Sequence, residues 1–287
     1  MISIFLLSFF MFGSISATDS SHHLQKAYEY KQSQNVIKAL EHLEIARSQE
    51  PTNINLWFEC AYLYATIDEY EKAETLYKKV IQHLPNNPDL LYNLGYVLKK
   101  QNKMLEAIEV YEKILQANQS SGKVLRALSH AYLAIGDFEK GWPAYEYRWV
   151  NPPAYNLQLK QYLDHGGSLV GKTVLLKTEY GLGDTFHFIR YAKTLKAMGA
   201  RIIVECHRQS LIPLLSLCSY IDTIIAPGEK LPPSDFQALI MSMPWILNTT
   251  LDTIPAEVPY LYADQGLEEG WKQNLVSDKK YKIGICW

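Results

Sequence analysis

Apolar residues recur at helical spacing along the first half of the chain and in short separate runs along the second half. From about Ser21 to Trp149 they follow the three-to-four-residue period of amphipathic helices. The pattern also repeats along the chain. When the sequence is aligned with itself so that Ala39 meets Ala73, small residues align with small residues and large apolar residues with large apolar residues. This repeat register predicts stacked pairs of helices over residues 20–151.

Two kinds of aligned positions define the repeat. Small side chains let the two helices of a pair approach closely, and tyrosine or leucine side chains fill the space between neighbouring pairs. Pro51 and Pro85, separated by the same shift, are expected to end the second helix of their pairs. The small sets are Ala39, Ala73 and Ala107, and Ala27, Ala61, Gly95 and Ser129; the large sets are Tyr30, Tyr64, Leu98 and Tyr132, and Leu43, Tyr77, Tyr111 and Tyr145.

Two interleaved size classes with a period of about 34 residues resemble the tetratricopeptide repeat, here in about four copies. The resemblance implies a concave surface that binds a peptide or a partner protein. The alternative is a scaffold that only supports the next domain. Gly136 to Trp149 closes the array with aromatic residues at helical spacing. We expect this segment to be a capping helix rather than a ligand cage formed by Trp142 and Trp149.

Asn151-Pro152-Pro153 breaks the helical pattern, and β-branched runs separated by helical stretches follow it. Strands that alternate with helices are typical of a parallel sheet with both faces covered, here a Rossmann-like α/β fold. The predicted strands cover 173–178, 201–205, 222–226, 238–243 and 281–287, with helices over 185–198 and 209–217.

Residues 166–173 match the phosphate-loop pattern G-x-x-x-x-G-K-[ST]. Such a loop holds phosphate with the amides of a helix that follows a strand. Here a strand follows the loop and none precedes it. We therefore expect no phosphate site around Lys172.

A better placed loop runs from Glu179 to Asp184, between the first predicted strand and the next helix. Gly181 and Gly183 allow a tight turn and the close approach of a ligand to the backbone. Asp184 stands at the helix start, where a carboxylate is electrostatically favoured. It is either a structural N-cap, worth about 1 kcal/mol, or a general base in a cleft at the carboxyl end of the sheet.

A third interpretation treats the same loop as a dinucleotide-binding turn. Glu205, at the end of the second predicted strand, would then bind the ribose. The fingerprint is incomplete, because Phe186 replaces its third glycine. On this interpretation the chain is a Rossmann dinucleotide binder.

The sequence around this loop resembles a glycosyltransferase family. Lys177-Thr178, Gly183-Asp184 and His187 are similar to the lysine-threonine, glycine-aspartate and histidine run near the start of bacterial heptosyltransferases, with one extra residue before Asp184. Bacterial proteins that fuse tetratricopeptide repeats to a heptosyltransferase-like domain are more similar still. Segments 136–149, 179–191 and 242–261 carry that similarity.

The resemblance implies a GT-B fold, in which one Rossmann-like half receives the acceptor and a second half binds a nucleotide sugar. It also implies that Asp184 activates the acceptor hydroxyl and that Lys177, Gly181, Gly183 and His187 line the substrate cleft. Residues 281–287 then look like the first strand of the second half, so the donor-binding half is missing. We expect glycosyltransferase ancestry without sugar transfer by this chain. The alternatives are a protein-binding scaffold module and the dinucleotide binder.

Composition narrows the set of partners. With 48% apolar residues and a net charge of -2, the chain is expected to fold and to lack the basic surface that nucleic acids require. Its four cysteines lie far apart and without metal-ligand spacing, so we expect buried thiols and no metal. We expect no bound cofactor; a nucleotide sugar would be the donor substrate of a complete enzyme.

The N-terminal segment bears on localisation. Met1 to Thr18 is mostly apolar and carries no charged side chain, which fits a secretory signal. The protein is exported if this segment is a signal and cytoplasmic otherwise. The predicted organisation is a signal-like segment (1–19), repeats (20–151), a connector (152–172), the acceptor half of a GT-B domain (173–280) and the opening strand of a second half (281–287).

Overall fold

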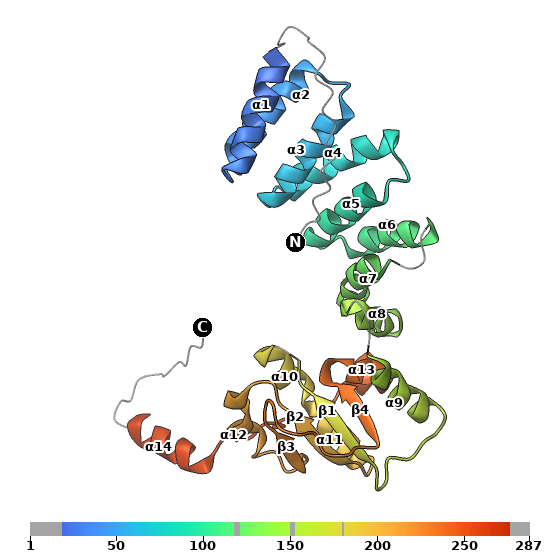
Figure 1. Ribbon diagram of the computed structural model, residues 1–287, viewed down its shortest axis with the longest axis vertical. Helices are drawn as coiled ribbons and strands as arrows, with labels where there is room; N and C mark the ends of the chain where they lie inside the picture. Colours follow the sequence, from blue (N-terminus) through green and yellow to red (C-terminus); the bar gives the residue numbers. More distant parts are fainter. Residues whose placement is uncertain (1–18, 118–120, 150–152, 180, 276–287) are drawn as a thin grey trace. The chain divides into compact units, whose positions relative to one another are not determined.

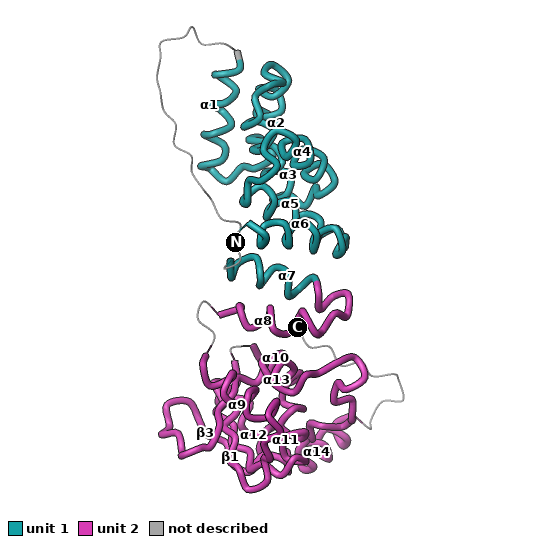
Figure 2. The backbone as a smooth tube through the Cα atoms, turned by 90° about the vertical axis from the view of Figure 1, so that its right-hand side faces the viewer, with its two compact units in different colours: residues 1–131 teal, residues 132–287 magenta. Residues whose placement is uncertain are grey.

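A computed structural model describes residues 19–117, 121–149, 153–179 and 181–275 (Figure 1). The chain forms two compact units, residues 1–131 and residues 132–287 (Figure 2). Residues 1–18 and the last predicted strand, 281–287, lie outside the described residues. Within the described ranges, no helix is both long enough and apolar enough to cross a membrane.

Helices α1 to α8 form pairs, and three residues join the two helices of each pair. The second helices of successive pairs begin at equal intervals, as the repeat register predicts. Pro51 and Pro85 follow the ends of α2 and α4, which confirms their predicted role. The helices are α1 (Asp19–Gln32), α2 (Val36–Gln49), α3 (Ile54–Thr66), α4 (Tyr70–His83), α5 (Pro88–Lys100), α6 (Met104–Ala117), α7 (Gly122–Ala134) and α8 (Phe138–Tyr145).

A residue in the left-handed conformation lies in the turn of each pair. Gln34, Asp68, Asn102 and Gly136 have φ angles of 58°, 62°, 61° and 81°. In every turn the following residue donates its backbone N–H to a carbonyl five residues earlier, at 2.8 to 3.0 Å. This bond satisfies a carbonyl that the helix end leaves free. Asp, Asn and Gly adopt this conformation more readily than other residues, so the turns reinforce the repeat register.

Packing inside the array follows the two predicted size classes. Ala39, Ala73 and Ala107 are fully buried, and so is Tyr111. A Cβ atom at Gly95 would lie 2.5 Å from the Tyr111 ring, so only glycine fits at this position of the third repeat. The small and large residues therefore meet where the repeat pattern places them.

Glu74 is a buried carboxylate that joins α4 to the turn after α5; its side chain is 9% exposed. The ammonium groups of Lys78 and Lys103 each lie 2.6 Å from a carboxylate oxygen, and the Gln101 amide donates to the same group at 2.8 Å. Burial alone would raise the pKa of Glu74. The hydrogen bonds from Lys103, Lys78 and Gln101 outweigh burial and lower the pKa to about 2.

Acid should weaken the array through this carboxylate. Because the pKa of Glu74 is lower in the folded chain than its ordinary value of 4.5, its contribution is complete above that value and is lost as the pH falls toward about 2. We expect Glu74→Gln to lower the free energy of unfolding by about 1–2 kcal/mol at neutral pH and by less in acid. Urea unfolding at both pH values measures this, with the exposed Glu71→Gln as control. An equal acid sensitivity of the Glu74→Gln and unchanged chains would contradict the expectation.

The second unit contains a four-stranded parallel sheet in the order β3-β2-β1-β4. Alternate residues of β1 enter different clusters: Val174 and Leu176 join the large core beside α9 and α11, and Leu175 joins Ile203 and Ile225 on the other face. The elements are α9 (Ala154–Asp164), β1 (Thr173–Lys177), α10 (Leu182–Phe188), α11 (Arg190–Ala197), β2 (Arg201–Glu205), α12 (Ile212–Leu215), β3 (Thr223–Ile225), β4 (Phe236–Leu239), α13 (Met243–Ile246) and α14 (Gln265–Leu275), with short 3-10 turns between them.

Several elements differ from the sequence prediction, and the helix predicted over 185–198 is two helices, α10 and α11. The stretch predicted as a polar connector, 152–172, contains helix α9, which packs on β4. The fourth strand is Phe236–Leu239 rather than 238–243, and a 3-10 turn over Ile240–Ser242 follows it. The strand ends there because the backbone N–H of Met241 donates to the Glu179 carboxylate instead of to a neighbouring strand.

Candidate functional site

The predicted site loop leaves β1 at the carboxyl edge of the sheet. Lys177, the last residue of β1, lies with its ammonium group 3.5 Å from Glu205 Oε2 and 5.4 Å from the centre of the Tyr155 ring. The adjacent strand ends therefore carry an ion pair. Glu205, the proposed ribose-binding acid, is engaged by Lys177.

Asp184 lies in the first turn of α10, so the N-cap interpretation is wrong. The N-cap is Gly181, which has no side chain that could cap the helix, and α10 begins at Leu182 rather than at 185. A Cβ atom at Gly181 would lie 2.1 Å from Asp184 Oδ2, so this glycine makes room for the aspartate. Gly183 is exposed, with open space where a Cβ atom would stand.

His187 follows Asp184 by three residues on α10. Its side chain is exposed and lies 4.8 Å from the Phe188 ring between centroids, and its backbone carbonyl accepts a hydrogen bond from Arg190 Nε at 2.9 Å. Asp184 and His187 are thus on one short helix, whereas Lys177 is paired on the sheet. The roles assigned to these side chains by resemblance stay predictions.

The phosphate-loop look-alike over 166–173 is confirmed as a helix-to-strand connection, because α9 precedes it and β1 follows. Lys172 pairs with Asp235, with 3.1 Å between Nζ and Oδ1. Across the described ranges, no group of three His, Cys, Asp or Glu side chains is arranged to hold a metal ion.

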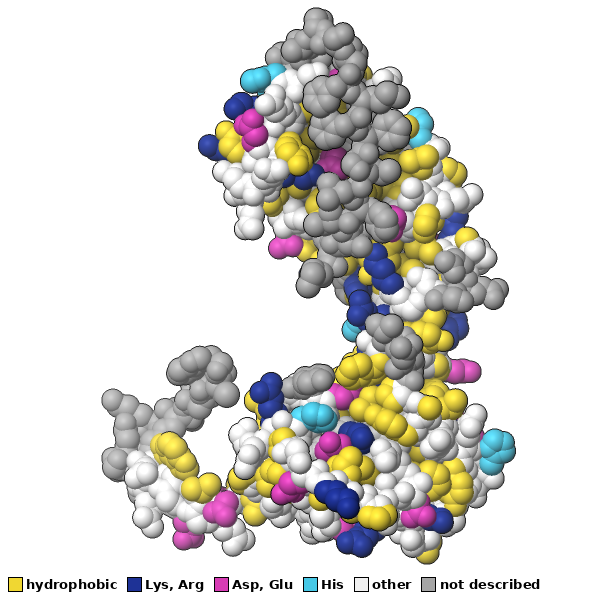
Figure 3. Space-filling model, viewed as in Figure 1, with side chains coloured by type: hydrophobic (Ala, Val, Ile, Leu, Met, Phe, Trp, Pro, Cys, Tyr) yellow, Lys and Arg dark blue, Asp and Glu magenta, His cyan; other side chains and the backbone are white. Residues whose placement is uncertain are grey.

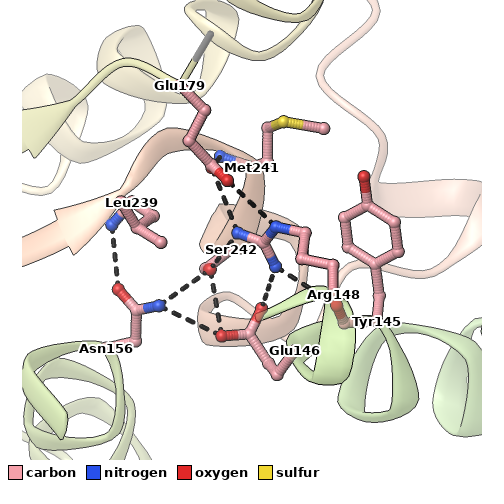
Figure 4. Close-up of polar contacts among 8 residues, drawn as sticks. All are labelled: Tyr145, Glu146, Arg148, Asn156, Glu179, Leu239, Met241 and Ser242. Atoms are coloured by element: carbon pink, nitrogen blue, oxygen red, sulfur yellow. Dashed lines mark hydrogen bonds and ion pairs between the residues drawn. The ribbon is translucent and has the colours of Figure 1, made fainter. Parts of the chain in front are cut away.

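A buried charged network lies next to the loop and was not anticipated from the sequence (Figure 4). The Arg148 guanidinium donates two hydrogen bonds to the Glu179 carboxylate, at 3.0 and 3.1 Å, and one to the Glu146 carboxylate, at 2.9 Å. Asn156 and Ser242 complete the network by bonding the remaining Glu146 oxygen at 3.1 and 3.0 Å. The segment after α8 is thereby fixed to α9, to the loop after β1 and to the turn after β4.

The same network shows how burial and pairing compete at Arg148, whose side chain is 11% exposed. Burial would lower the pKa of the guanidinium, but the hydrogen bonds and attraction of Glu179 and Glu146 raise it. With the acceptors of both carboxylates in use, this cluster holds the fold together rather than offering a reactive group. The sequence contains one indication of this network: charged residues such as Arg148 and Glu179 stand among aromatic and apolar residues.

The helical array offers a different kind of site, a groove of about 320 Å³. The first helices of all four pairs, α1, α3, α5 and α7, contribute to it, together with the α1–α2 turn and the start of α2. Phe58 and Tyr62 are one helical turn apart on α3 and give the groove an apolar floor. Its lining residues are Lys31, Gln34, Val36, Phe58, Glu59, Tyr62, Leu63, Thr66, Asp89, Asn93 and Lys123.

A second cavity of about 330 Å³ lies between α5, α6 and α7 and shares Asp89 and Lys123 with the groove. There the ammonium group of Lys123 stands 3.8 Å from the centre of the Tyr92 ring. This distance is within the range of a cation–π contact. The two cavities therefore form adjoining parts of one surface of the array.

One set of aligned aromatic positions lies outside the buried core, and its member Tyr62 lines the groove. Tyr28, Tyr62, Tyr96 and His130 occupy the same position of successive repeats, and Tyr28 is 56% exposed while His130 is exposed as well. At the core positions, Tyr111 is fully buried and Tyr64 is half-buried. The regular spacing of this set was a signal available in the sequence.

Residues 55–118 match a family model described as YpiA-like, C-terminal tetratricopeptide repeats. The general transcriptional corepressor trfA of Dictyostelium discoideum is 27% identical over 108 residues, which are 37% of this chain and 8% of that protein. The protein CTR9 homolog of Arabidopsis thaliana is 30% identical over 94 residues, 31% of this chain and 9% of that protein. The chain thus spans less than a tenth of these two relatives.

Among solved structures, MamA MSR-1 C2 is 26% identical, with 45% of this chain and 75% of that chain covered and a TM-score of 0.43. A tetratricopeptide repeat protein from Parabacteroides merdae ATCC 43184 is 16% identical, with 45% and 51% covered and a TM-score of 0.42. Neither of the two relatives named above is described as a glycosyltransferase. The family model and the repeat register identify the helix pairs α1 to α8 as an array of tetratricopeptide repeats.

Proposed function

We propose that the protein is an interaction scaffold whose array binds a peptide segment of a partner protein in the groove defined above. The observation that carries the proposal is the groove itself, which is formed jointly by the first helices of all four pairs. A surface built from several repeats is suited to an extended ligand, because each repeat adds side chains in register with the last.

The lining of the groove is chemically suited to a peptide. Phe58 and Tyr62 can bury an apolar side chain, and aromatic residues contribute strongly to binding when they are covered. Asn93 can both donate to a peptide carbonyl and accept from a peptide N–H. The relative from Dictyostelium is described as a general transcriptional corepressor. We do not extend that activity to this chain and propose only that it binds a partner protein.

Selection of a random peptide library on the immobilised 287-residue chain tests the proposal. We expect enriched peptides whose dissociation constant, measured by fluorescence anisotropy, rises at least about tenfold in Tyr62→Ala. Leu105→Ala is the matched control, because Leu105 is an apolar side chain on α6 that is 67% exposed and outside the groove. Peptides that bind Tyr62→Ala and the unchanged chain equally well would overturn the proposal, provided that circular dichroism shows both chains folded.

For the second unit, the acceptor half of a GT-B enzyme stays our proposal about ancestry. It is supported by the parallel sheet and by the position of Asp184 directly after the β1 edge. We expect no nucleotide-sugar turnover by the unchanged chain; turnover that Asp184→Asn abolishes would contradict this expectation and would assign the aspartate as a general base.

A further inference from the structure

Charge is distributed unevenly among the helices of the array. Helices α5 and α7 together carry four basic side chains, Lys99, Lys100, Lys123 and Arg126, against the single carboxylate of Asp89. Helix α6, between them in sequence, has the opposite balance, with Glu106, Glu109 and Glu112 against Lys113. In a chain whose net charge is only -2, this separation concentrates positive charge on one surface. We call Lys99, Lys100, Lys123 and Arg126 the basic face.

Helix geometry brings the basic face together beside the groove. Lys123, Arg126 and His130 are spaced by three and four residues along α7, so they lie on one side of that helix. Lys123 lines both the groove and the adjoining cavity, and its ammonium group lies over Tyr92 of α5. The Lys100 ammonium lies 5.8 Å from the centre of the Tyr96 ring on the same helix. Figure 3 shows Lys and Arg side chains close together over this part of the array.

The basic side chains lie close enough to one another to lower one another's pKa values. Burial, with Lys100 and Arg126 nearby, lowers the pKa of Lys99, and burial, Lys99 and Arg126 lower the pKa of His130. No ion pair in the described part of the chain joins a carboxylate to any member of the basic face. By contrast, Lys31, Lys78 and Lys103 of the same array are all paired with glutamates.

Like charges held together in this way oppose folding, and an anion bound from outside would offset them. Perturbed basic groups next to a binding groove are typical of a site for a negatively charged ligand. Lys123 and Arg126 are about 4.5 Å apart along α7 at the helical rise of 1.5 Å per residue, and Lys99 and Lys100 add further positive charge from α5. A face contributed by two helices matches several carboxylates of an extended peptide better than one phosphate group.

We propose that the basic face binds an acidic stretch of the partner peptide, that is, a run of Asp or Glu carboxylates next to the segment held in the groove. This inference rests on the proposed function and adds the charge of the ligand to it. The apolar floor formed by Phe58 and Tyr62 would hold the uncharged part of the peptide. Lys99, Lys100, Lys123 and Arg126 would hold the carboxylates.

Fluorescein-labelled octaglutamate and octaglutamine peptides test the inference by anisotropy with the full chain. We expect octaglutamate to bind at least about tenfold more tightly than octaglutamine and to lose affinity as salt is added. The double variant Lys99→Gln/Arg126→Gln should weaken octaglutamate binding by at least about tenfold. Its melting temperature should stay the same or rise, because two mutually repelling charges are gone. A residue that only supports the fold would not give weaker binding together with equal or higher stability.

The matched control is Lys38→Gln/Lys79→Gln, which removes the same charge from exposed positions on α2 and α4. Equal weakening by both double variants, or equal binding of octaglutamate and octaglutamine, would overturn the inference. Tighter binding of an octapeptide with a single phosphoserine would overturn it in favour of a phosphate ligand. Library peptides that need Tyr62 but bind the Lys99→Gln/Arg126→Gln chain unchanged would overturn only the acidic preference, leaving the groove assigned.

Discussion

Ala73→Trp is expected to destabilise the array by more than about 3 kcal/mol. Ala73 is fully buried in α4, and the equivalent positions of the neighbouring repeats hold the buried Ala39 and Ala107. Overpacking a dense core typically costs about 1–3 kcal/mol, and an indole in place of a methyl group exceeds the usual insertion. Urea unfolding followed by far-ultraviolet circular dichroism measures the loss.

The control for this change is Thr75→Trp, an exposed position on the same helix. It introduces the same side chain where nothing is packed, and we expect it to alter the free energy of unfolding by less than about 0.5 kcal/mol. If Ala73→Trp were as stable as Thr75→Trp, the close approach of the helices within a repeat would be wrong.

Arg148→Met is expected to destabilise the second unit by about 3–5 kcal/mol, the range observed when one partner of a buried ion pair is removed. Methionine is unbranched like arginine and carries no charge. The change leaves the carboxylates of Glu146 and Glu179, which are 6% and 7% exposed, without their cation. Thermal and urea unfolding of the full chain measure the effect.

Two further variants separate the network from a general effect of losing a charge. Arg208→Met removes an exposed arginine and should leave stability within about 0.5 kcal/mol of the unchanged chain. Adding Glu179→Gln to Arg148→Met should recover part of the loss, because it removes one stranded charge and keeps an acceptor for the Met241 N–H. An Arg148→Met chain as stable as Arg208→Met would show that the network does not hold the unit together.

The repeat was predictable because its determinants are local. A residue such as Ala73 or Gly95 needs only its own helix and the next one to define its environment, and those helices are neighbours along the chain. The left-handed turn residues, such as Asn102, act over still shorter distances. The period of the sequence pattern therefore translates directly into helices that begin one repeat apart.

The candidate loop was predictable in position but not in detail. The sequence placed Gly181 and Asp184 between the first strand and a helix; in the structure Gly181 lies there and Asp184 lies in the first turn of the helix. It did not reveal that α10 begins at Leu182, because the residues around Gly183 have no strong preference for either side of a helix start. The role of Asp184 as a helix cap failed for that reason.

By itself, the sequence determined the helical repeats, their register and the alternation of strands and helices that follows, but not helix α9 or the bounds of the fourth strand. The features that it determined depend on periodicity and on neighbours along the chain. Only the tertiary structure decided which charges meet. Arg148 bonds Ser242 across 94 positions of the chain and Glu179 across 31, and no local pattern records such partners. The groove and the basic face likewise arise from side chains that separate helices bring together. Their pairing depends on three-dimensional packing, in which the burial of a charge requires a partner wherever in the chain that partner lies.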